Sequence, residues 1–212
     1  MPTTEVRNPL FARIYPRLAQ MMEREVGHHR DELLAELSGR VVEVGAGNGM
    51  NFGHYPAGVE EVVAVEPEPY LRAKAVDAAD AAPVRVTVVD AVADALPFEA
   101  TSFDAAVCSL VLCTVPDQAA TLAEVRRVLR SGGELRFFEH VRGSSPRKAR
   151  VQAVLDRSGV WPRIAGGCHS ARDSRAAIAA GGFTIERVRD LTIGPAWGLT
   201  SPHILGRATV SS

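Results

Sequence analysis

The glycine cluster Gly45-Ala46-Gly47-Asn48-Gly49 directly follows a short β-branched run at 41–44. A glycine turn at the carboxyl end of a first parallel strand lets the backbone approach a bound ligand closely. The dinucleotide motif GxGxxG would need glycine at Met50, and the phosphate-binding motif GxxxxGK(S/T) does not occur in the sequence. The spacing therefore predicts a ligand at this turn, but not through either of those two motifs.

Two carboxylates follow the next two predicted strands. Glu66 lies 21 residues after Gly45, where an acidic side chain can accept hydrogen bonds from both ribose hydroxyls of a nucleoside. Asp90-Ala91 closes the third strand, where the adenine of an adenosyl ligand would lie. Each carboxylate alone is typical of a polar strand end, but the three strand ends line one edge of a parallel sheet. Together they favour an adenosyl ligand at this edge.

Histidines and basic residues lie at the end of the fifth predicted strand and after it. His140 could face a substrate or orient a base there, and a hydrogen-bonded structural histidine is an equal alternative. His169 is a weaker candidate, for which a structural role is favoured. A basic run could attract an acidic substrate, although a solvated helix start is favoured. It comprises Arg142, Arg147, Lys148 and Arg150.

The three cysteines, Cys108, Cys113 and Cys168, are too few for a disulfide framework. No CxxC pair or Cys/His ladder in the sequence predicts a zinc site, so we expect no metal. Cys108 lies in an apolar run and is expected to be a buried structural thiol.

The elements that must position these residues alternate between strands and helices. A β-branched run predicts a strand at 40–44, and further strands are predicted at 61–65, 84–89, 103–109, 134–141, 183–191 and 203–210. Helical spacing predicts helices at 69–79, 117–129, 149–157 and 171–180, and two helices in 11–37 separated at Gly27. This alternation predicts a parallel sheet covered by helices. The short connection before the last strand predicts that this strand is antiparallel.

Length and composition set the class of protein. The 212 residues fit one domain at roughly 100–200 residues per domain. The 46% of hydrophobic and 23% of charged residues are typical of a globular protein. The net charge of −1 means that no overall positive charge attracts nucleic acid. The N-terminus carries charges and three prolines, so we expect neither a signal peptide nor a membrane anchor. We therefore expect a cytoplasmic protein. We divide the chain into an N-terminal helical lid at 1–38 and a ligand-binding domain at 39–212.

The set of motifs resembles the class I S-adenosylmethionine-dependent methyltransferases over about residues 40–210. Besides the glycine cluster, it includes Glu66-Pro67, Asp90-Ala91, Leu96-Pro97-Phe98, Ser102-Phe103-Asp104 and the stretch 124–133. Ser131 stands where proline is usual in the family. The resemblance implies an α/β, seven-stranded Rossmann-like fold with the last strand antiparallel, S-adenosylmethionine as cofactor and S-adenosylhomocysteine as product.

The resemblance also implies which residues hold the cofactor. The methionine part of the cofactor would contact the glycine loop and Asn51, and its amino-acid moiety would lie close to Ser109. Its ribose would bind to Glu66, and its adenine would bind to Asp90 and Ala91. Tyr15 could close a lid over the site, although a plain core or surface tyrosine is favoured. The cofactor-binding positions so implied are Gly45, Ala46, Gly47, Asn51, Glu66, Pro67, Asp90, Ala91 and Ser109.

Further motifs resemble the small-thiol S-methyltransferases of the methyltransferase-like group. They are Met50-Asn51-Phe52, Tyr55-Pro56, the run 108–113, Phe138-Glu139-His140-Val141, Gly167-Cys168, Gly194-Pro195 and Pro202-His203-Ile204. Animal members of that group carry an N-terminal membrane anchor, and we expect no stable membrane insertion of this chain. The resemblance implies a small thiol as methyl acceptor, with His140 as the candidate catalytic residue.

Two alternatives remain open at this point. The general motifs also resemble ubiquinone and menaquinone C-methyltransferases, so a quinol or phenol could be methylated on carbon or oxygen. A protein of another class, a sensor or partner subunit, could bind the cofactor without turnover. Methylation of nucleic acid is not expected, because aromatic residues are only 6% and the Pro-Pro-Tyr/Phe type of motif is absent.

Overall fold

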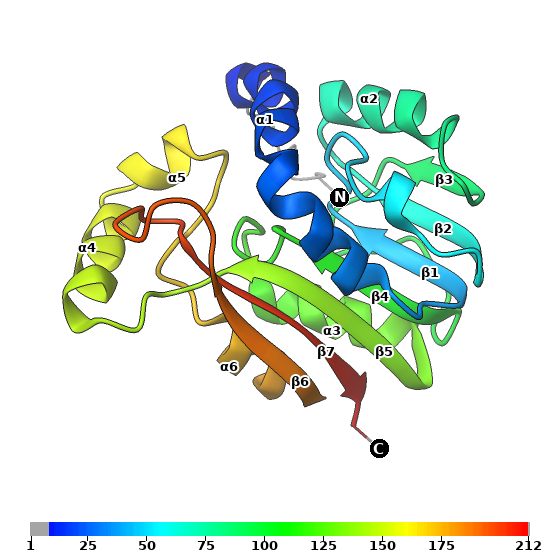
Figure 1. Cartoon of the computed structure of the whole chain (residues 1–212). Coiled ribbons are helices and arrows are strands. Elements are labelled where there is room, and N and C mark those ends of the chain that lie inside the picture. The colour runs from blue at the N-terminus through cyan, green and yellow to red at the C-terminus, as the bar shows by residue number, and fades with distance from the viewer. Residues whose placement is uncertain (1–8, 212) are drawn as a thin grey trace.

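The computed structural model describes residues 9–211, so the first eight residues of the predicted lid lie outside the described part. One seven-stranded sheet has the order β3-β2-β1-β4-β5-β7-β6 (Figure 1). Only β7 runs antiparallel, to both β5 and β6, which confirms the predicted α/β architecture. The strands are β1 (Gly39–Val44), β2 (Val59–Val65), β3 (Val86–Val89), β4 (Phe103–Ser109), β5 (Leu129–His140), β6 (Phe183–Thr192) and β7 (Pro202–Val210).

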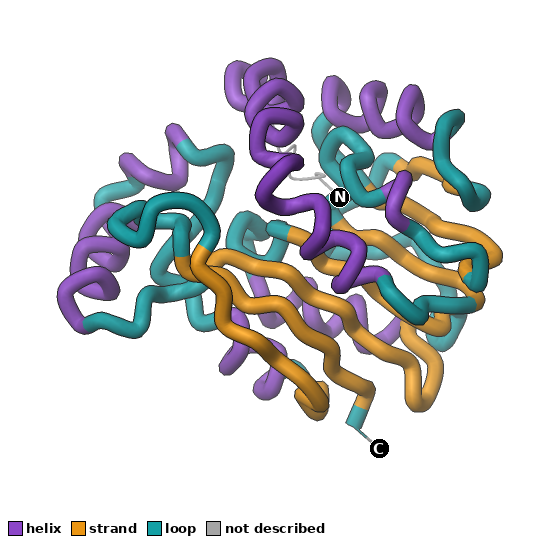
Figure 2. The backbone as a smooth tube through the Cα atoms, viewed as in Figure 1, coloured by secondary structure: helices purple, strands orange, loops and turns teal. Residues whose placement is uncertain are grey.

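Helices cover both faces of the sheet (Figure 2). On one face lie α1 (Pro9–Leu34) and α2 (Pro69–Ala79), and on the other α3 (Gln118–Val128) and α6 (Ser174–Ala180). The helices α4 (Pro146–Arg157) and α5 (Val160–Ile164) stand beyond the carboxyl end of β5 (Figure 1). A short 3-10 turn, η1 (Phe52–His54), follows the glycine loop.

The valines of strand β1 are buried on both of its faces because the strand lies in the middle of this covered sheet. Val42 and Val44 belong to the same buried cluster as Leu122 of α3. Val41 points to the opposite face and belongs to a cluster with Leu34 of α1. Successive side chains of a strand alternate between faces, so a strand buried on both sides needs a continuous apolar run. Most polar residues of the site therefore lie at the strand ends or in the loops that follow, and the two carboxylates inside strands, Glu43 and Glu139, are both buried and hydrogen-bonded.

The predicted break at Gly27 is wrong, because α1 continues through it and also contains Pro16. An interior glycine costs about 1 kcal/mol relative to alanine. Burying a valine or leucine side chain stabilises by roughly 1.5–3 kcal/mol, and Val26, Leu33 and Leu34 are all buried by this helix. Tertiary packing therefore outweighs the local signal of the glycine.

Two other boundaries differ from the prediction. We expected Gly132-Gly133 to end the helix before a strand at 134, but α3 ends at Val128 and β5 begins at Leu129. Gly132, with φ of +74°, lies inside β5. The segment expected to be a loop before α6 contains the five-residue helix α5, which begins after Gly159. Within residues 9–211, no helix combines the length and the apolar character needed to cross a membrane.

Candidate functional site

The glycine loop turns back on the sheet immediately after β1. The N–H groups of Gly45 and Ala46 both donate to the Val65 carbonyl of β2, at 2.9 and 3.0 Å. Gly45 and Gly47 have φ of +70° and +58°, a region that favours glycine. A Cβ added at position 45 would also clash with the side chain of Val111. Backbone conformation thus requires glycine at both positions, and close packing against the turn after β4 requires it at Gly45.

Glu66, at the end of β2, reaches back to this loop. Its Oε2 accepts a hydrogen bond from the Gly47 N–H at 2.7 Å, and its Oε1 accepts one from the Glu68 N–H at 2.9 Å. Burial raises the pKa of Glu66 to about 7, although the two backbone hydrogen bonds oppose the shift. Each carboxylate oxygen has a second lone pair. The fixed carboxylate can therefore still accept hydrogen bonds from two ligand hydroxyls.

Asp90 and Ala91 follow the end of the neighbouring strand β3, as the sequence predicted. The Asp90 carboxylate pairs with Arg72 Nη2 at 2.8 Å and is 67% exposed. Arg72 Nη1 also donates to the carbonyls of Glu66 and Pro67, at 3.0 and 2.9 Å. Arg72 therefore joins the ends of β2 and β3, and the adenine-binding role of Asp90 and Ala91 stays a prediction.

Asn51 belongs to a buried polar network. Its Oδ1 accepts a hydrogen bond from Arg30 Nη1 at 2.6 Å, and its Nδ2 donates to Glu43 Oε1 at 2.8 Å. Tyr55 donates to the other oxygen of Glu43 at 2.7 Å. Burial raises the pKa of Glu43 to about 7 against these hydrogen bonds. Asn51 thus links α1 to β1, and its direct contact with a cofactor stays a prediction.

Two buried polar atoms at the carboxyl edge have no hydrogen-bond partner among the described residues. They are Ser109 Oγ, at the end of β4, and Asn48 Oδ1, in the glycine loop. Buried polar groups in folded proteins nearly always have a partner. A ligand bound at this edge can supply the missing hydrogen bonds. The sequence predicted Ser109 as a site residue and did not predict Asn48, although Asn48 lies between the two glycines at 47 and 49.

Tyr15 of α1 covers the glycine loop. A Cβ added at Gly47 would lie 3.4 Å from Tyr15 Cε1. The ring of Phe11 lies 5.4 Å from that of Tyr15 and fills the space that a Cβ at Gly166 would occupy. The start of α1 therefore contacts both the glycine loop and the loop that follows α5. This position fits the predicted lid, whose role stays a prediction.

The chain turns sharply after β4. Leu110 has φ of +59°, which is uncommon for a bulky residue. The N–H groups of residues 111–113 then all donate to the buried carboxylate of Glu139 in β5, at 2.9, 2.8 and 3.1 Å. Glu139 therefore holds this turn against the sheet edge. Glu139 had no predicted role of its own, although a carboxylate inside an apolar strand is the signal that could have identified it.

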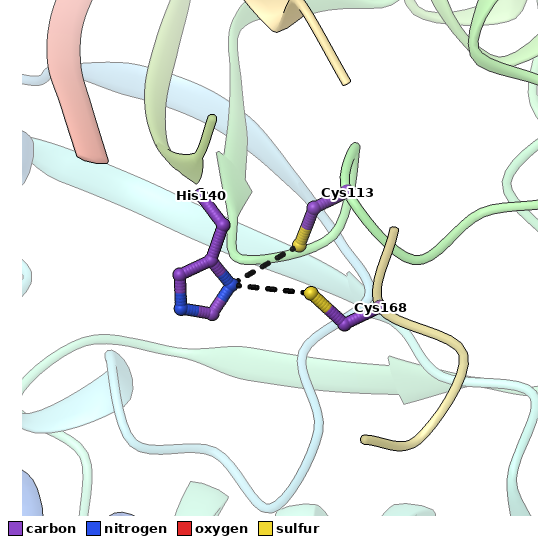
Figure 3. Close-up of side chains that lie close together, drawn as sticks. All are labelled: Cys113, His140 and Cys168. Carbon is purple, nitrogen blue, oxygen red and sulfur yellow. Dashed lines mark hydrogen bonds between the residues drawn. The ribbon is translucent and has the colours of Figure 1, made fainter. Parts of the chain in front are cut away.

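This turn places Cys113 beside His140, and Cys168 approaches from the loop before α6 (Figure 3). His140 Nδ1 lies 3.5 Å from each of the two sulfurs. The three ligand-type atoms all lie within 4.8 Å of one another, and both cysteines are buried. Burial lowers the pKa of His140, but its hydrogen bond with Cys113 opposes this effect, and the pKa is raised overall. The sequence singled out His140 but not the cysteines, which lie 27 and 28 residues away.

The basic run after β5 is partly structural. Lys148 Nζ donates to the Gly198 carbonyl at 3.0 Å and to Ser201 Oγ at 2.8 Å, in the loop between β6 and β7. Arg142 pairs with Asp173 at 3.1 Å, with both side chains about half exposed. For Lys148, the expectation of a simply solvated helix start is therefore wrong, because the lysine fixes a loop that is distant in sequence.

Comparison with known proteins finds one family match and several relatives. Residues 42–137 match a family described as a methyltransferase domain. The chain is 33% identical over 204 residues to the thiol S-methyltransferase TMT1A of Homo sapiens, an alignment that covers 93% of this chain and 82% of that protein. It is 30% identical over 171 residues to the ubiquinone/menaquinone biosynthesis C-methyltransferase UbiE of Syntrophotalea carbinolica, covering 74% and 70% of the two chains.

A solved structure supports the same architecture. A SAM-dependent methyltransferase from Thermotoga maritima aligns with a TM-score of 0.66 at 21% identity, covering 95% of this chain and 98% of that one. At this level of identity the likeness concerns the fold alone.

Proposed function

The chain belongs to the S-adenosylmethionine-dependent methyltransferases, and on that premise we propose that it methylates the sulfur of a small, fairly apolar thiol. The main support is the extent of the similarity to a thiol S-methyltransferase. The general methyltransferase match ends at residue 137, whereas the match to that relative covers 93% of the chain. It therefore must include much of the region beyond residue 137, which carries His140 and Cys168.

The carboxyl edge of the sheet fits the cofactor. The glycine turn allows close backbone approach, Glu66 offers fixed oxygens for ribose hydroxyls, and two buried polar atoms lack partners. We assign the ribose to Glu66 and the amino-acid moiety to Ser109 with the glycine loop. Tyr15 and the start of α1 would then act as the lid, because they lie over Gly47.

In a methyl transfer of this kind, the main task of the protein is to align the two reactants. When bound, S-adenosylmethionine supplies a methyl group already activated on a sulfonium sulfur. The protein residues have to orient the acceptor in line with that methyl and exclude water. A thiol with a pKa near ~8.5 is already a few per cent thiolate at neutral pH, so it needs only help with ionisation. His140, beside the turn after β4, is the residue we propose for that help.

A second candidate is methylation of a quinol or phenol on carbon or oxygen. The alignment with UbiE, at 30% identity over 171 residues, favours this alternative specifically. Such acceptors ionise less readily than thiols and need a better placed base, so the two candidates differ in how strongly turnover depends on His140.

The deciding experiment compares methyl transfer to matched thiol, phenol and quinol acceptors of similar size. We expect the fastest transfer to the thiol, with a rate that rises with pH towards the pKa of each thiol tested. Faster transfer to the phenol or quinol would replace the thiol proposal with the second candidate. Binding of S-adenosylmethionine in a calorimeter with no transfer to any acceptor would instead indicate a binding protein without turnover.

A further inference from the structure

We propose that Cys113, His140 and Cys168 form a binding site for a soft divalent metal ion of the zinc type. They come from the turn after β4, the end of β5 and the loop before α6, and their side chains point toward one another (Figure 3). Among the described residues, these three donor atoms gather within 4.8 Å. Two thiolates and one imidazole are ligands that zinc prefers.

The two nitrogen-to-sulfur distances match those around a tetrahedral ion. Zinc binds sulfur at about 2.3 Å and imidazole nitrogen at about 2.0–2.1 Å, which at a tetrahedral angle sets nitrogen and sulfur roughly 3.5 Å apart. His140 Nδ1 lies 3.5 Å from Cys113 Sγ and 3.5 Å from Cys168 Sγ. An ion between the three atoms would thus need little movement of the side chains.

Hydrogen bonding explains this arrangement less well. Nδ1 of a histidine carries either one proton or one lone pair in the ring plane, so it makes one regular hydrogen bond. Here two sulfurs lie at the same distance from it. A metal ion accepts the lone pairs of all three atoms at once, and it removes the competition between the two thiols for the histidine.

The surrounding backbone holds the cysteines in place without any metal. The carboxylate of Glu139 fixes the turn that carries Cys113. The His169 N–H donates to the Cys113 carbonyl at 2.7 Å, which joins the two cysteine loops. Gly167, with φ of +93°, allows the turn just before Cys168. A site preorganised in this way loses little conformational entropy when the ion binds.

The described residues supply three ligands, and three protein ligands with one open position are typical of catalytic zinc sites. Resting on the function proposed above, we assign the fourth position to the sulfur of the acceptor thiol. The site borders the cofactor edge on two sides. Val111, two residues before Cys113, packs against Gly45, and Phe11 of the lid packs on Gly166, two residues before Cys168.

The metal would lower the pKa of the acceptor thiol, whose proton leaves to solvent. A sulfur lone pair of the bound thiolate then forms the new bond to the methyl carbon. The bond between that carbon and the sulfonium sulfur breaks, and its electron pair stays on the sulfur of S-adenosylhomocysteine. The neutral thioether product is a weaker ligand than the thiolate, so it can leave.

The test measures zinc binding to the reduced, metal-depleted protein, without cofactor or acceptor, by titration against a chromophoric chelator. We expect one equivalent bound tightly, and a loss of affinity of more than about 100-fold in Cys113→Ala and Cys168→Ala. Even changes around metal ligands cost about 10–100-fold in affinity. Cys108→Ala is the matched control, because this third cysteine is buried in β4 and should leave zinc binding unchanged. Circular dichroism checks that each variant is folded.

Equal zinc binding in the wild-type protein and both cysteine variants would overturn the metal site, as would the absence of tight binding. A thiol count showing that Cys113 and Cys168 form a disulfide in place of metal binding would overturn it as well.

Cobalt substitution separates the metal site from the proposed function. Thiolate-to-cobalt absorption bands should appear in the wild-type protein and change when a small alkanethiol is added, but not when a matched phenol is added. Unchanged bands on thiol addition would overturn the assignment of the fourth position. The binding assays use no methyl transfer, so a failure of the thiol proposal in the acceptor panel would be seen independently.

Discussion

The two halves of the carboxyl edge are built in different ways. On the β1–β3 side, the glycine loop and Glu66 follow two neighbouring strands, and a backbone N–H of the loop, that of Gly47, donates to the Glu66 carboxylate. On the β4–β5 side, side chains from three distant segments meet at Cys113, His140 and Cys168. The first half can bind a ligand shared by many enzymes, whereas the second can determine what the enzyme acts on.

Because the two halves differ in this way, substitutions in each half should affect either cofactor binding or acceptor chemistry, but not both. Changes in the glycine half should weaken cofactor binding and leave the cysteine–histidine cluster intact. Changes in the cluster should alter turnover and acceptor preference and leave cofactor binding intact.

The largest effect is expected from Gly47→Val. Valine is strained at φ of +58°, and its branched side chain, whose Cβ would already contact the Tyr15 ring, would block approach of a ligand to the backbone. We expect cofactor binding to be nearly abolished in a folded protein that still binds zinc. Calorimetric titration with S-adenosylhomocysteine measures the loss, and native affinity in a variant folded by circular dichroism would refute our interpretation of the loop.

Glu66→Ala should have the next largest effect. Two charge-assisted hydrogen bonds to ribose hydroxyls would disappear, each contributing roughly 1.5–3 kcal/mol. Cofactor affinity should fall by about 100-fold or more, since 1.4 kcal/mol corresponds to a factor of about ten. If titration calorimetry finds unchanged affinity, Glu66 does not belong to the site.

Cofactor affinity should also depend on pH through Glu66. Its pKa is raised to about 7 in the free protein, and the ionised carboxylate is the better hydrogen-bond acceptor. Binding should therefore strengthen as pH rises through 7, by about tenfold between pH 6 and pH 8, with release of a proton below pH 7. Glu66→Gln, which cannot ionise, should remove this dependence, and a dependence of equal size in that variant would assign it to another group.

The smallest effect is expected from His140→Ala on the methylation of acidic thiols. Such acceptors ionise without help, so their turnover should fall by less than about tenfold, whereas alkyl thiols should lose more. Cofactor affinity should stay unchanged, which is the control for the separation of the two halves. An equal loss for all thiols would indicate that His140 acts by positioning rather than by aiding ionisation.

Local patterns in the sequence predict most of the fold. Apolar runs predict the central strands, because strands covered on both faces need continuous apolar residues, and the glycine turn and acidic strand ends predict the edge at which we propose the cofactor. Where local signals misled, as at Gly27, burial of neighbouring residues such as Val26 and Leu33 outweighed the weak preference of a single residue.

The sequence by itself determined the order of the elements and the strand ends that carry the glycine turn and the carboxylates, because those depend on periodicity and on short motifs. Only the tertiary structure decided that Cys113, His140 and Cys168 meet, since each follows a different element. It also decided that Glu139 holds the turn carrying Cys113 and that Tyr15 lies over Gly47. Such contacts arise from the way parallel strands and their covering helices pack, and no spacing along the chain encodes them.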